Sequence, residues 1–319
     1  MSAKKILILG GSGFVGTWIT SRLAVPGVEL TIPTRRRERT KQLITLPAVK
    51  MPQENIHDPE TLVRLMRGQD AVINLVGALH DRDSRYPYGK DFAAAHVELP
   101  QKIVAAMQKA GVSRLLHMSA LNAGRDAPSE YLRSKGEGQE IVLAAQDKLD
   151  VTVFCPSVIF GLGDRFLTTF ARALKLTPVF FVGGVTSRFQ PVFIGDVANA
   201  FVDALSRSST HGQVYHLCGP KIYTLRQLIE YAGEISGCPR PVYGLSPLFA
   251  YLQAGFLWCL PRPLMSPDNL RSMEIDNIGD GSCLYPAWEP TALEAVAPQY
   301  LGTAAPKARL NVFRLHARR

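Results

Sequence analysis

The sequence predicts an α/β fold in which a doubly wound parallel sheet is joined to a smaller C-terminal subdomain. Short apolar stretches alternate with stretches of helical periodicity up to residue 156. The first apolar stretch, residues 6–9, leads directly into a glycine-rich turn and then into a helical pattern. Residues 71–77 are almost continuously apolar, as expected of a parallel strand that helices cover on both faces. Beyond residue 156 the alternation is less regular, which predicts the second subdomain.

The turn after the first strand has glycines at positions 10, 13 and 16. Gly10, Gly13 and Gly16 allow a tight turn and a close approach of the backbone to phosphate groups. The N-terminus of the following helix offers free N–H groups and a partial positive charge. The alternative is a turn that binds nothing. The position of the glycine turn between the first strand and the first helix favours binding of a nucleotide diphosphate over this alternative.

Residues 28–33 form the second predicted strand, and Thr34, Arg35 and Arg36 follow it where a dinucleotide fold meets the adenosine ribose. An acidic residue there would accept hydrogen bonds from the ribose of NAD, whereas arginines suit the additional phosphate of NADP. We therefore favour NADP(H) over NAD(H), with a solvated basic loop as the alternative. After a short strand near residue 50, Asn55 and Ile56 are expected beside the adenine.

Three more strands and their helices complete the predicted sheet. The strand at residues 71–77 should end along the cofactor, and residues 115–119 and 151–155 form the next two strands. One helix is predicted through residues 96–107 and another begins at Tyr131.

The helix that begins at Tyr131 has Ser129 as its expected N-cap. Gly136 and Gly138 each weaken this helix by about 1 kcal/mol relative to alanine. We therefore expect both glycines to pack closely against a neighbouring element.

The C-terminal half alternates helical and extended patterns over the carboxyl edge of the sheet, where a second ligand would be enclosed. The predicted division is an NADP-binding core at residues 1–155, a subdomain at 156–300 that is partly interleaved with the core, and a basic tail at 301–319. Residues 249–260 are apolar but too few to span a bilayer. A core or groove-lining helix is favoured for them, and a surface facing a membrane or partner is the alternative.

The net charge of +9 and the pI of 9.4 favour an anionic partner, which could be a nucleotide, an acidic protein surface or a membrane. Nucleic acid is the least supported partner, because no binding motif and no interleaving of basic with aromatic residues is found. No secretory or transit segment is recognised, so a cytoplasmic, bacterial-like location is expected, with a peripheral position at the inner membrane as a further option.

The cysteines and histidines indicate neither a disulfide framework nor a metal site. The five cysteines are scattered without a CxxC pair, and the seven histidines show no HxxxH spacing. Structural histidines and a reducing compartment are therefore expected.

Ser119, Tyr131 and Lys135 are the residues that could carry chemistry. A tyrosine titrates near pH 10, so proton transfer at neutral pH requires a nearby cation. Lys135 lies four positions after Tyr131 and would share its helix face, while Ser119 at a strand end could orient a substrate oxygen. Tyr86 and Lys90 have the same spacing outside such a frame, so the spacing alone is weak. The alternative is a packing tyrosine and a ribose-binding lysine without turnover.

Further motifs extend this set along the chain. They are His96-Val97-Glu98, His117-Met118-Ser119-Ala120-Leu121, Tyr131-Leu132-Arg133-Ser134-Lys135, Pro156-Ser157-Val158-Ile159-Phe160-Gly161 and Gly195-Asp196-Val197-Ala198. Over residues 4–235 the chain resembles the extended and atypical short-chain dehydrogenase/reductases. It resembles in particular the branch containing the NADPH-binding alpha-subcomplex subunit nine of respiratory complex I and its bacterial relatives.

The resemblance implies a Rossmann core that holds NADPH, with a site beside Ser119 and Tyr131. In the complex I subunit the cofactor is thought to be structural. Asn55 stands where the wider family usually has an acid, and His96 where asparagine is common. The residues expected around the cofactor are Gly10, Ser12, Gly13, Phe14, Val15, Gly16, Thr34, Arg35, Arg36, Asn55, Ile56, Leu75, Val76, Gly77, Lys135, Pro156, Ser157 and Val158.

Two functions follow as hypotheses. The favoured one is an NADP(H)-dependent oxidoreductase that transfers hydride to or from a carbonyl or alcohol of an apolar, lipid- or quinone-related substrate. The alternative is a non-catalytic NADPH-binding accessory protein that docks on a respiratory membrane complex. The intact Ser119, Tyr131 and Lys135 favour the first.

Overall fold

The fold is described from a computed structural model of residues 4–35, 41–46, 48–83, 86–260 and 264–302. The chain divides into two compact units. The first comprises Met1–Pro156, Val197–His216 and Cys283–Tyr285, and the second comprises Ser157–Asp196, Leu217–Ser282 and Pro286–Arg319.

The first unit is built on a seven-stranded sheet of order β11-β6-β5-β4-β1-β2-β3. Leu7 pairs in parallel register with both Thr31 and Val72, so β1 lies between β2 and β4. The strands are β1 (Lys4–Leu9), β2 (Val28–Thr31), β3 (Val49–Lys50), β4 (Ala71–Asn74), β5 (Arg114–Met118), β6 (Asp150–Pro156) and β11 (Gln213–Leu217).

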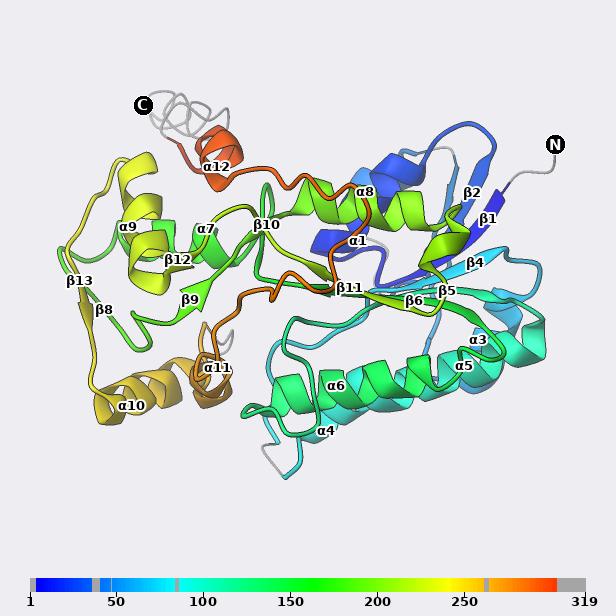
Figure 1. The fold of residues 1–319 in the computed structure, drawn as a ribbon, viewed down its shortest axis with the longest axis horizontal. Helices are drawn as coiled ribbons and strands as arrows, with labels where there is room; N and C mark the ends of the chain where they lie inside the picture. Colours follow the sequence, from blue (N-terminus) through cyan, green and yellow to red (C-terminus); the bar gives the residue numbers. More distant parts are fainter. Residues whose placement is uncertain (1–3, 36–40, 47, 84–85, 261–263, 303–319) are drawn as a thin grey trace, which may run out of the picture. The chain divides into compact units, whose positions relative to one another are not determined.

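Helices cover both faces of this sheet, with α3, α5 and α6 on one face and α1 and α8 on the other (Figure 1). This covering explains why Ile6 to Leu9 of β1 are fully buried. The helices are α1 (Phe14–Leu23), α2 (Lys41–Ile44), α3 (Pro59–Met66), α4 (Lys90–Phe92), a π-helical turn (Ala93–Glu98), α5 (Leu99–Ala110), α6 (Glu130–Leu143), α8 (Ile194–Ala204) and a 3-10 turn (Ser208–Thr210). The predicted doubly wound α/β fold is confirmed.

Two local expectations on α6 are also confirmed. Ser129 caps the helix by accepting a hydrogen bond from the Leu132 N–H at 3.2 Å. A Cβ on Gly138 would lie 1.9 Å from the carbonyl oxygen of His96, and a Cβ on Gly136 would lie 2.5 Å from Gly124. Both glycines therefore let α6 pack against neighbouring backbone.

The helix expected through residues 96–107 begins earlier than predicted. Helical structure starts at Lys90 and passes through the π-helical turn into α5. Asp81 accepts a hydrogen bond from the Phe92 N–H at 2.7 Å and thereby stabilises this earlier start. Because Asp81 lies outside the helix, helical periodicity alone could not locate this boundary.

The second unit combines short strand pairs with helices. Its strands are β7 (Ile159–Phe160), β8 (Phe180–Val182), β9 (Arg188–Phe189), β10 (Val192–Phe193), β12 (Tyr223–Thr224) and β13 (Val242–Gly244). They form the pairs β10–β7, β12–β9 and β13–β8. The helices are α7 (Phe166–Ala173), α9 (Leu225–Ile235), α10 (Pro247–Trp258), α11 (Pro267–Ser272) and α12 (Leu293–Leu301).

Of the alternatives for residues 249–260, a core or groove-lining helix or an outward-facing surface, α10 excludes a core helix. Only Ala250 and Ala254 of α10 are buried, and most of its large apolar side chains are exposed. A helix seated through two alanines leaves its bulky side chains outside the core. Over the described residues, no helix combines the length and the apolar character needed to cross a membrane.

Candidate functional site

The glycine turn after β1 has the geometry that phosphate binding requires. Gly10 has φ +79°, in the left-handed region that favours glycine. A Cβ on Gly16 would lie 2.5 Å from the carbonyl oxygen of Gly10, so this position also requires glycine. Gly13 is the N-cap of α1 and makes no side-chain capping bond, and the first turn of α1 contains no acidic residue. The turn and the helix start therefore present backbone N–H groups to an anion.

The residues of this turn differ in their exposure to solvent. Gly13 is exposed, Ser12 and Phe14 are partly buried, and Val15 and Gly16 are buried. Residues 12–14 are thus more accessible to a ligand than Val15 and Gly16.

Thr34 and Arg35 lie in the loop after β2, where the ribose and the additional phosphate of a dinucleotide are expected to bind. Thr34 is buried and its N–H donates to the Pro52 carbonyl at 3.0 Å, whereas Arg35 is exposed. Arg36 lies outside the described residues. The loop at Asn55 is close by, because the Arg35 charge contributes, after burial and Lys102, to lowering the pKa of His57. Asn55 is exposed and accepts the His57 N–H, and Ile56 packs on the core of the sheet.

The chain leaving β4 passes beside the glycine turn, as expected. Leu75 donates its N–H to the Leu9 carbonyl at 2.9 Å. A Cβ on Gly10 would lie 3.0 Å from the carbonyl carbon of Leu75 and 3.1 Å from the nitrogen of Val76. Two residues on, a Cβ on Gly77 would lie 3.3 Å from Nζ of Lys135. The glycine turn, residues 75–77 and Lys135 therefore lie beside one another.

Ser119 and Lys135 meet at the carboxyl end of β5. Lys135 is buried, and its Nζ donates to the carbonyl of Met118 at 3.1 Å. Ser119 is also buried, and its Oγ makes no hydrogen bond to any described part of the chain. A buried hydroxyl without a partner is costly, so this Oγ is available to a bound group.

Tyr131 lies on α6, and its ring contacts two aromatic rings of the preceding helical segment. The ring centroids are 5.6 Å from His96 and 6.0 Å from Phe92, both in edge-on geometry. Tyr131 therefore contacts the same His96 ring whose pKa the Lys135 charge helps to lower, after burial.

A network of hydrogen bonds around His96, which the sequence alone does not predict, connects the chain segments of this region. The N–H of Ala78 donates to Nε2 of His96 at 3.0 Å, which places the proton of a neutral His96 on Nδ1. Nδ1 then donates to Ser134 Oγ at 2.8 Å, and Ser134 Oγ donates to the Tyr131 carbonyl at 2.8 Å. His96 therefore links the loop after β4 to α6.

Asn74 and His117 form a second hydrogen-bonded pair in this region. Asn74 Nδ2 donates to Nδ1 of His117 at 3.1 Å, and Asn74 Oδ1 accepts the N–H of Val76 at 3.2 Å. Both side chains are buried at neighbouring strand ends. Structural histidines are expected from the spacing, which does not predict that His117 meets Asn74 or that His96 meets Ser134. Of these residues, only His96 departs from the wider family's pattern and so draws attention to this region.

Burial controls the charges in the site. It raises the pKa of the Tyr131 hydroxyl to about 12 and lowers the pKa of the Lys135 ammonium to about 8. Burial and then the Lys135 charge lower the pKa of His117 to about 3. Burial, with Lys135 and His117, also lowers the pKa of His96 well below its usual value. At neutral pH both imidazoles are neutral, Tyr131 is protonated and Lys135 is mostly charged.

The last expected cofactor residues divide between the two units. Pro156 ends β6 in the first unit, and its carbonyl accepts the Leu121 N–H at 3.0 Å. Ser157 and Val158 belong to the second unit, where Ser157 Oγ and the Val158 N–H both bind Oδ1 of Asn277 at 2.6 and 3.0 Å.

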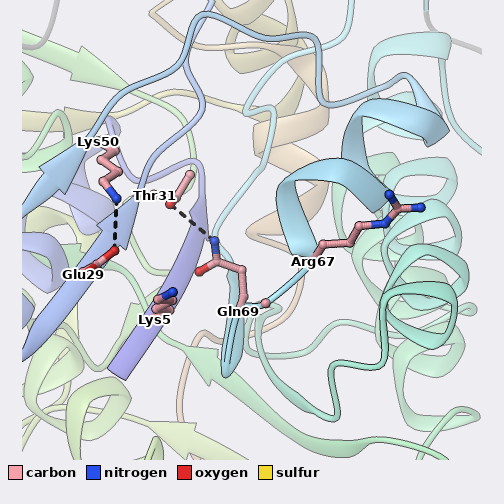
Figure 2. Close-up of a pocket in the computed structure, with 7 residues that line it drawn as sticks. Lys5, Glu29, Thr31, Lys50, Arg67 and Gln69 are labelled. Carbon is pink, nitrogen blue, oxygen red and sulfur yellow. Dashed lines mark hydrogen bonds and ion pairs between the residues drawn. The ribbon is translucent and has the colours of Figure 1, made fainter. Parts of the chain in front are cut away.

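A separate pocket of about 170 Å³ lies beside the amino-terminal ends of β1 and β4 (Figure 2). Lys50 pairs with Glu29 at 3.0 Å, and Gln69 donates to Thr31 at 3.4 Å. The lining residues are Lys5, Glu29, Thr31, Lys50, Arg67, Gly68 and Gln69. None of them is a candidate site residue, because the candidate site lies at the carboxyl ends of the strands.

The chain is similar to several known proteins over most of its length. A reductase of Stenotrophomonas maltophilia, 2-alkyl-3-oxoalkanoate reductase, is 23% identical over 274 residues, which cover 77% of this chain and 80% of the relative. Mitochondrial NADH dehydrogenase [ubiquinone] 1 alpha subcomplex subunit 9 of Mus musculus is 29% identical over 279 residues, covering 85% of this chain and 72% of the relative. The predicted resemblance to the complex I subunit is thus confirmed.

A solved structure and a family pattern complete the comparison. The structure of Pal from Bacillus thuringiensis is 17% identical with a TM-score of 0.74 and covers 97% of this chain and 99% of that chain. The pattern of the NAD dependent epimerase/dehydratase family matches residues 6–218, more than half of the chain. The chain therefore belongs to the NAD dependent epimerase/dehydratase family.

Proposed function

We propose that the protein is an NADP(H)-dependent oxidoreductase that reduces a carbonyl group of an apolar, lipid- or quinone-related substrate. The observation that carries this proposal is the unpartnered, buried Oγ of Ser119 at the strand end where Lys135 also lies. A substrate oxygen at this position would satisfy the hydroxyl, which a purely structural site would leave without a partner.

The residues present fit a nicotinamide dinucleotide. A Cβ on Gly16 would lie 2.5 Å from the carbonyl oxygen of Gly10, and a Cβ on Gly77 would lie 3.3 Å from Lys135 Nζ, so glycine lets the helix start approach the turn and lets Lys135 approach the chain after β4. Gly10, Gly13 and Gly16 would hold the diphosphate and Lys135 would hold a ribose. The exposed Arg35 would pair with the phosphate that distinguishes NADP from NAD.

The protonation states favour reduction over oxidation. The bound cofactor would supply hydride. Because burial raises the pKa of Tyr131 to about 12, the hydroxyl carries its proton at neutral pH and is set to donate it to a developing alkoxide. Ser119 would orient the same oxygen, and the Lys135 cation would stabilise the resulting tyrosinate.

The apolar substrate is supported by one of the relatives. The Stenotrophomonas maltophilia protein is named for the reduction of a 2-alkyl-3-oxoalkanoate, an alkyl chain carrying a ketone. We extend this class of substrate to the present chain. Such a ketone provides the oxygen that Ser119 and Tyr131 would bind.

A second function is favoured by a different observation. The mouse relative is named as a subunit of NADH dehydrogenase, and the match spans most of this chain. A non-catalytic accessory protein of a respiratory membrane complex would keep the glycine turn and Lys135 to hold NADPH as a structural group. It would not need Ser119 or Tyr131, so the two functions make different demands on the same site.

The experiment that separates them combines binding with turnover. NADPH and NADH are titrated against the wild type and Arg35→Ala, and NADPH consumption is followed with 2-alkyl-3-oxo acids and quinones. The proposal predicts tighter binding of NADPH than of NADH, loss of this preference in Arg35→Ala, and turnover that Ser119→Ala reduces. Tight NADPH binding without turnover on any of these compounds would favour the accessory function instead.

A further inference from the structure

His117 is a buried histidine to which the proposed reaction gives no role. It lies on β5 and is the register partner of Asn74, the last residue of β4. Paired residues of neighbouring strands project their side chains from the same face of a sheet, so the two side chains meet directly. Asn74 Nδ2 and His117 Nδ1 lie 3.1 Å apart. Because both side chains are buried, these polar atoms depend on each other for a partner.

The backbone decides which atom of this pair donates. The N–H of Val76 can only donate, and it bonds to Oδ1 of Asn74 at 3.2 Å. The amide of Asn74 is thereby oriented with Nδ2 toward His117, and Nδ1 of the imidazole must accept. His117 is therefore neutral, with its proton on Nε2. Burial lowers the pKa of His117 to about 3, which agrees with a neutral ring.

This pair of side chains holds the chain just beyond the end of β4. Leu75 still belongs to the sheet ladder, since its N–H donates to a carbonyl of β1 at 2.9 Å. The next N–H, that of Val76, bonds to the Asn74 side chain instead of to a strand. A Cβ on Gly10 would lie 3.1 Å from this Val76 nitrogen. The bond from Asn74 therefore fixes Val76 where it lies against the glycine turn.

We infer that His117 is a positioning residue: by fixing the amide of Asn74, it holds residues 75–77 against the glycine turn in the conformation that the cofactor binds. The inference rests on the proposed function in taking this turn as the cofactor site. If residues 75–77 were free to move, cofactor binding would have to order them, which would lower the affinity. His117 itself need not contact the cofactor.

Two substitutions separate the hydrogen bond of His117 from its packing. His117→Leu keeps a buried side chain but removes the acceptor for Asn74. His117→Asn keeps an acceptor, because the oxygen of an asparagine is bonded to Cγ as Nδ1 of a histidine is. For His117→Leu we expect faster hydrogen exchange of the Val76 N–H and NADPH affinity lower by about tenfold, the value of one hydrogen bond. For His117→Asn both quantities should stay within about threefold of the wild type.

Thr152→Val is the matched control. Thr152 is also fully buried in the sheet, and its Oγ1 donates to the Thr210 carbonyl at 2.7 Å near the amino end of β6. Thr152→Val thus removes a buried hydrogen bond far along the strand from the glycine turn. It should leave Val76 exchange and NADPH affinity as in the wild type. Urea unfolding establishes that the variants compared are folded and of similar stability.

Unchanged Val76 exchange in His117→Leu would overturn the inference, and so would faster exchange together with unchanged NADPH affinity. Equal losses in His117→Asn and His117→Leu would assign His117 to packing instead. A wild type that does not bind NADPH would contradict the proposed function. The exchange of Val76 would then still decide whether His117 holds this segment of the chain.

Discussion

The backbone N–H of Ala78 donates a hydrogen bond to Nε2 of His96 at 3.0 Å. This bond fixes the loop after β4 against the π-helical turn, and π-helical turns are frequent at functional sites. On its other side the imidazole reaches Ser134 of α6, the helix that carries Tyr131 and Lys135. His96 thus positions both borders of the candidate site without needing to touch a ligand.

Replacement of His96 by alanine tests this role. His96→Ala leaves the Ala78 N–H without a partner and opens a cavity, so we expect a loss of about 2–4 kcal/mol in the free energy of unfolding and weaker NADPH binding. Urea unfolding and a nucleotide titration measure the two effects. His211→Ala is the control, because His211 pairs with Asp150 at a partly exposed position and should cost about 0–1 kcal/mol. Unchanged stability and NADPH affinity in His96→Ala would show that His96 does not position the candidate site.

A matched pair of glycines tests the phosphate-binding turn. Gly10 and Gly27 both have positive φ, +79° and +85°, but only Gly10 has backbone atoms where a Cβ would lie. Gly27→Ala should therefore cost about 1–2 kcal/mol from strain alone, with nucleotide affinity unchanged. Gly10→Ala should cost more and should abolish nucleotide binding. Equal effects of the two substitutions on nucleotide affinity would show that the turn does not hold the cofactor.

Removal of the Lys135 charge should separate stability from binding. The folded state lowers the Lys135 pKa from 10.5 to about 8, so it binds fewer protons than the unfolded chain between these values and stability rises with pH there. At pH 7 the buried cation is a cost, and Lys135→Met should raise the free energy of unfolding by about 1–3 kcal/mol. The same variant should bind NADPH more weakly. A less stable variant with normal NADPH affinity would contradict both statements.

The buried imidazole of His117 should make stability depend on acid pH. Its pKa is about 3 in the folded state, so only the unfolded chain binds this proton as the pH falls below 6.5. Stability should therefore decrease toward low pH, by about 1.4 kcal/mol per pH unit from this residue. In His117→Gln this part of the slope should be absent, which urea unfolding at several acid pH values measures. Parallel curves for the wild type and His117→Gln would show that the proton of His117 is not linked to folding.

Much of the fold could be predicted because it depends on local signals. The alternation of apolar and helical patterns predicts the sheet, and the glycine turn follows β1 as expected. Ser129 caps α6 for the reason that its side-chain type suggests. These features depend on contacts between residues close in the sequence, or on burial of whole strands.

The features that were missed depend on contacts between distant residues. Asp81 stabilises the start of helical structure at Lys90, and Asn74 meets His117 from a neighbouring strand. A core or groove-lining helix was favoured for residues 249–260, but most large apolar side chains of α10 are exposed. Composition alone cannot show which side of an apolar helix faces the protein. An isolated histidine or an apolar run does not show which distant residues it will contact, because these contacts form only when the strands and helices assemble.

The proposed reduction is tested most directly by following the transfer of deuterium from labelled NADPH to a 2-alkyl-3-oxo acid. We expect the label to appear on the carbinol carbon of the product with the wild type, and a decrease of roughly 100-fold or more in rate for Tyr131→Phe, which keeps the ring between His96 and Phe92 but lacks the proton. No label in the product, or an equal rate for Tyr131→Phe, would contradict the proposed reduction.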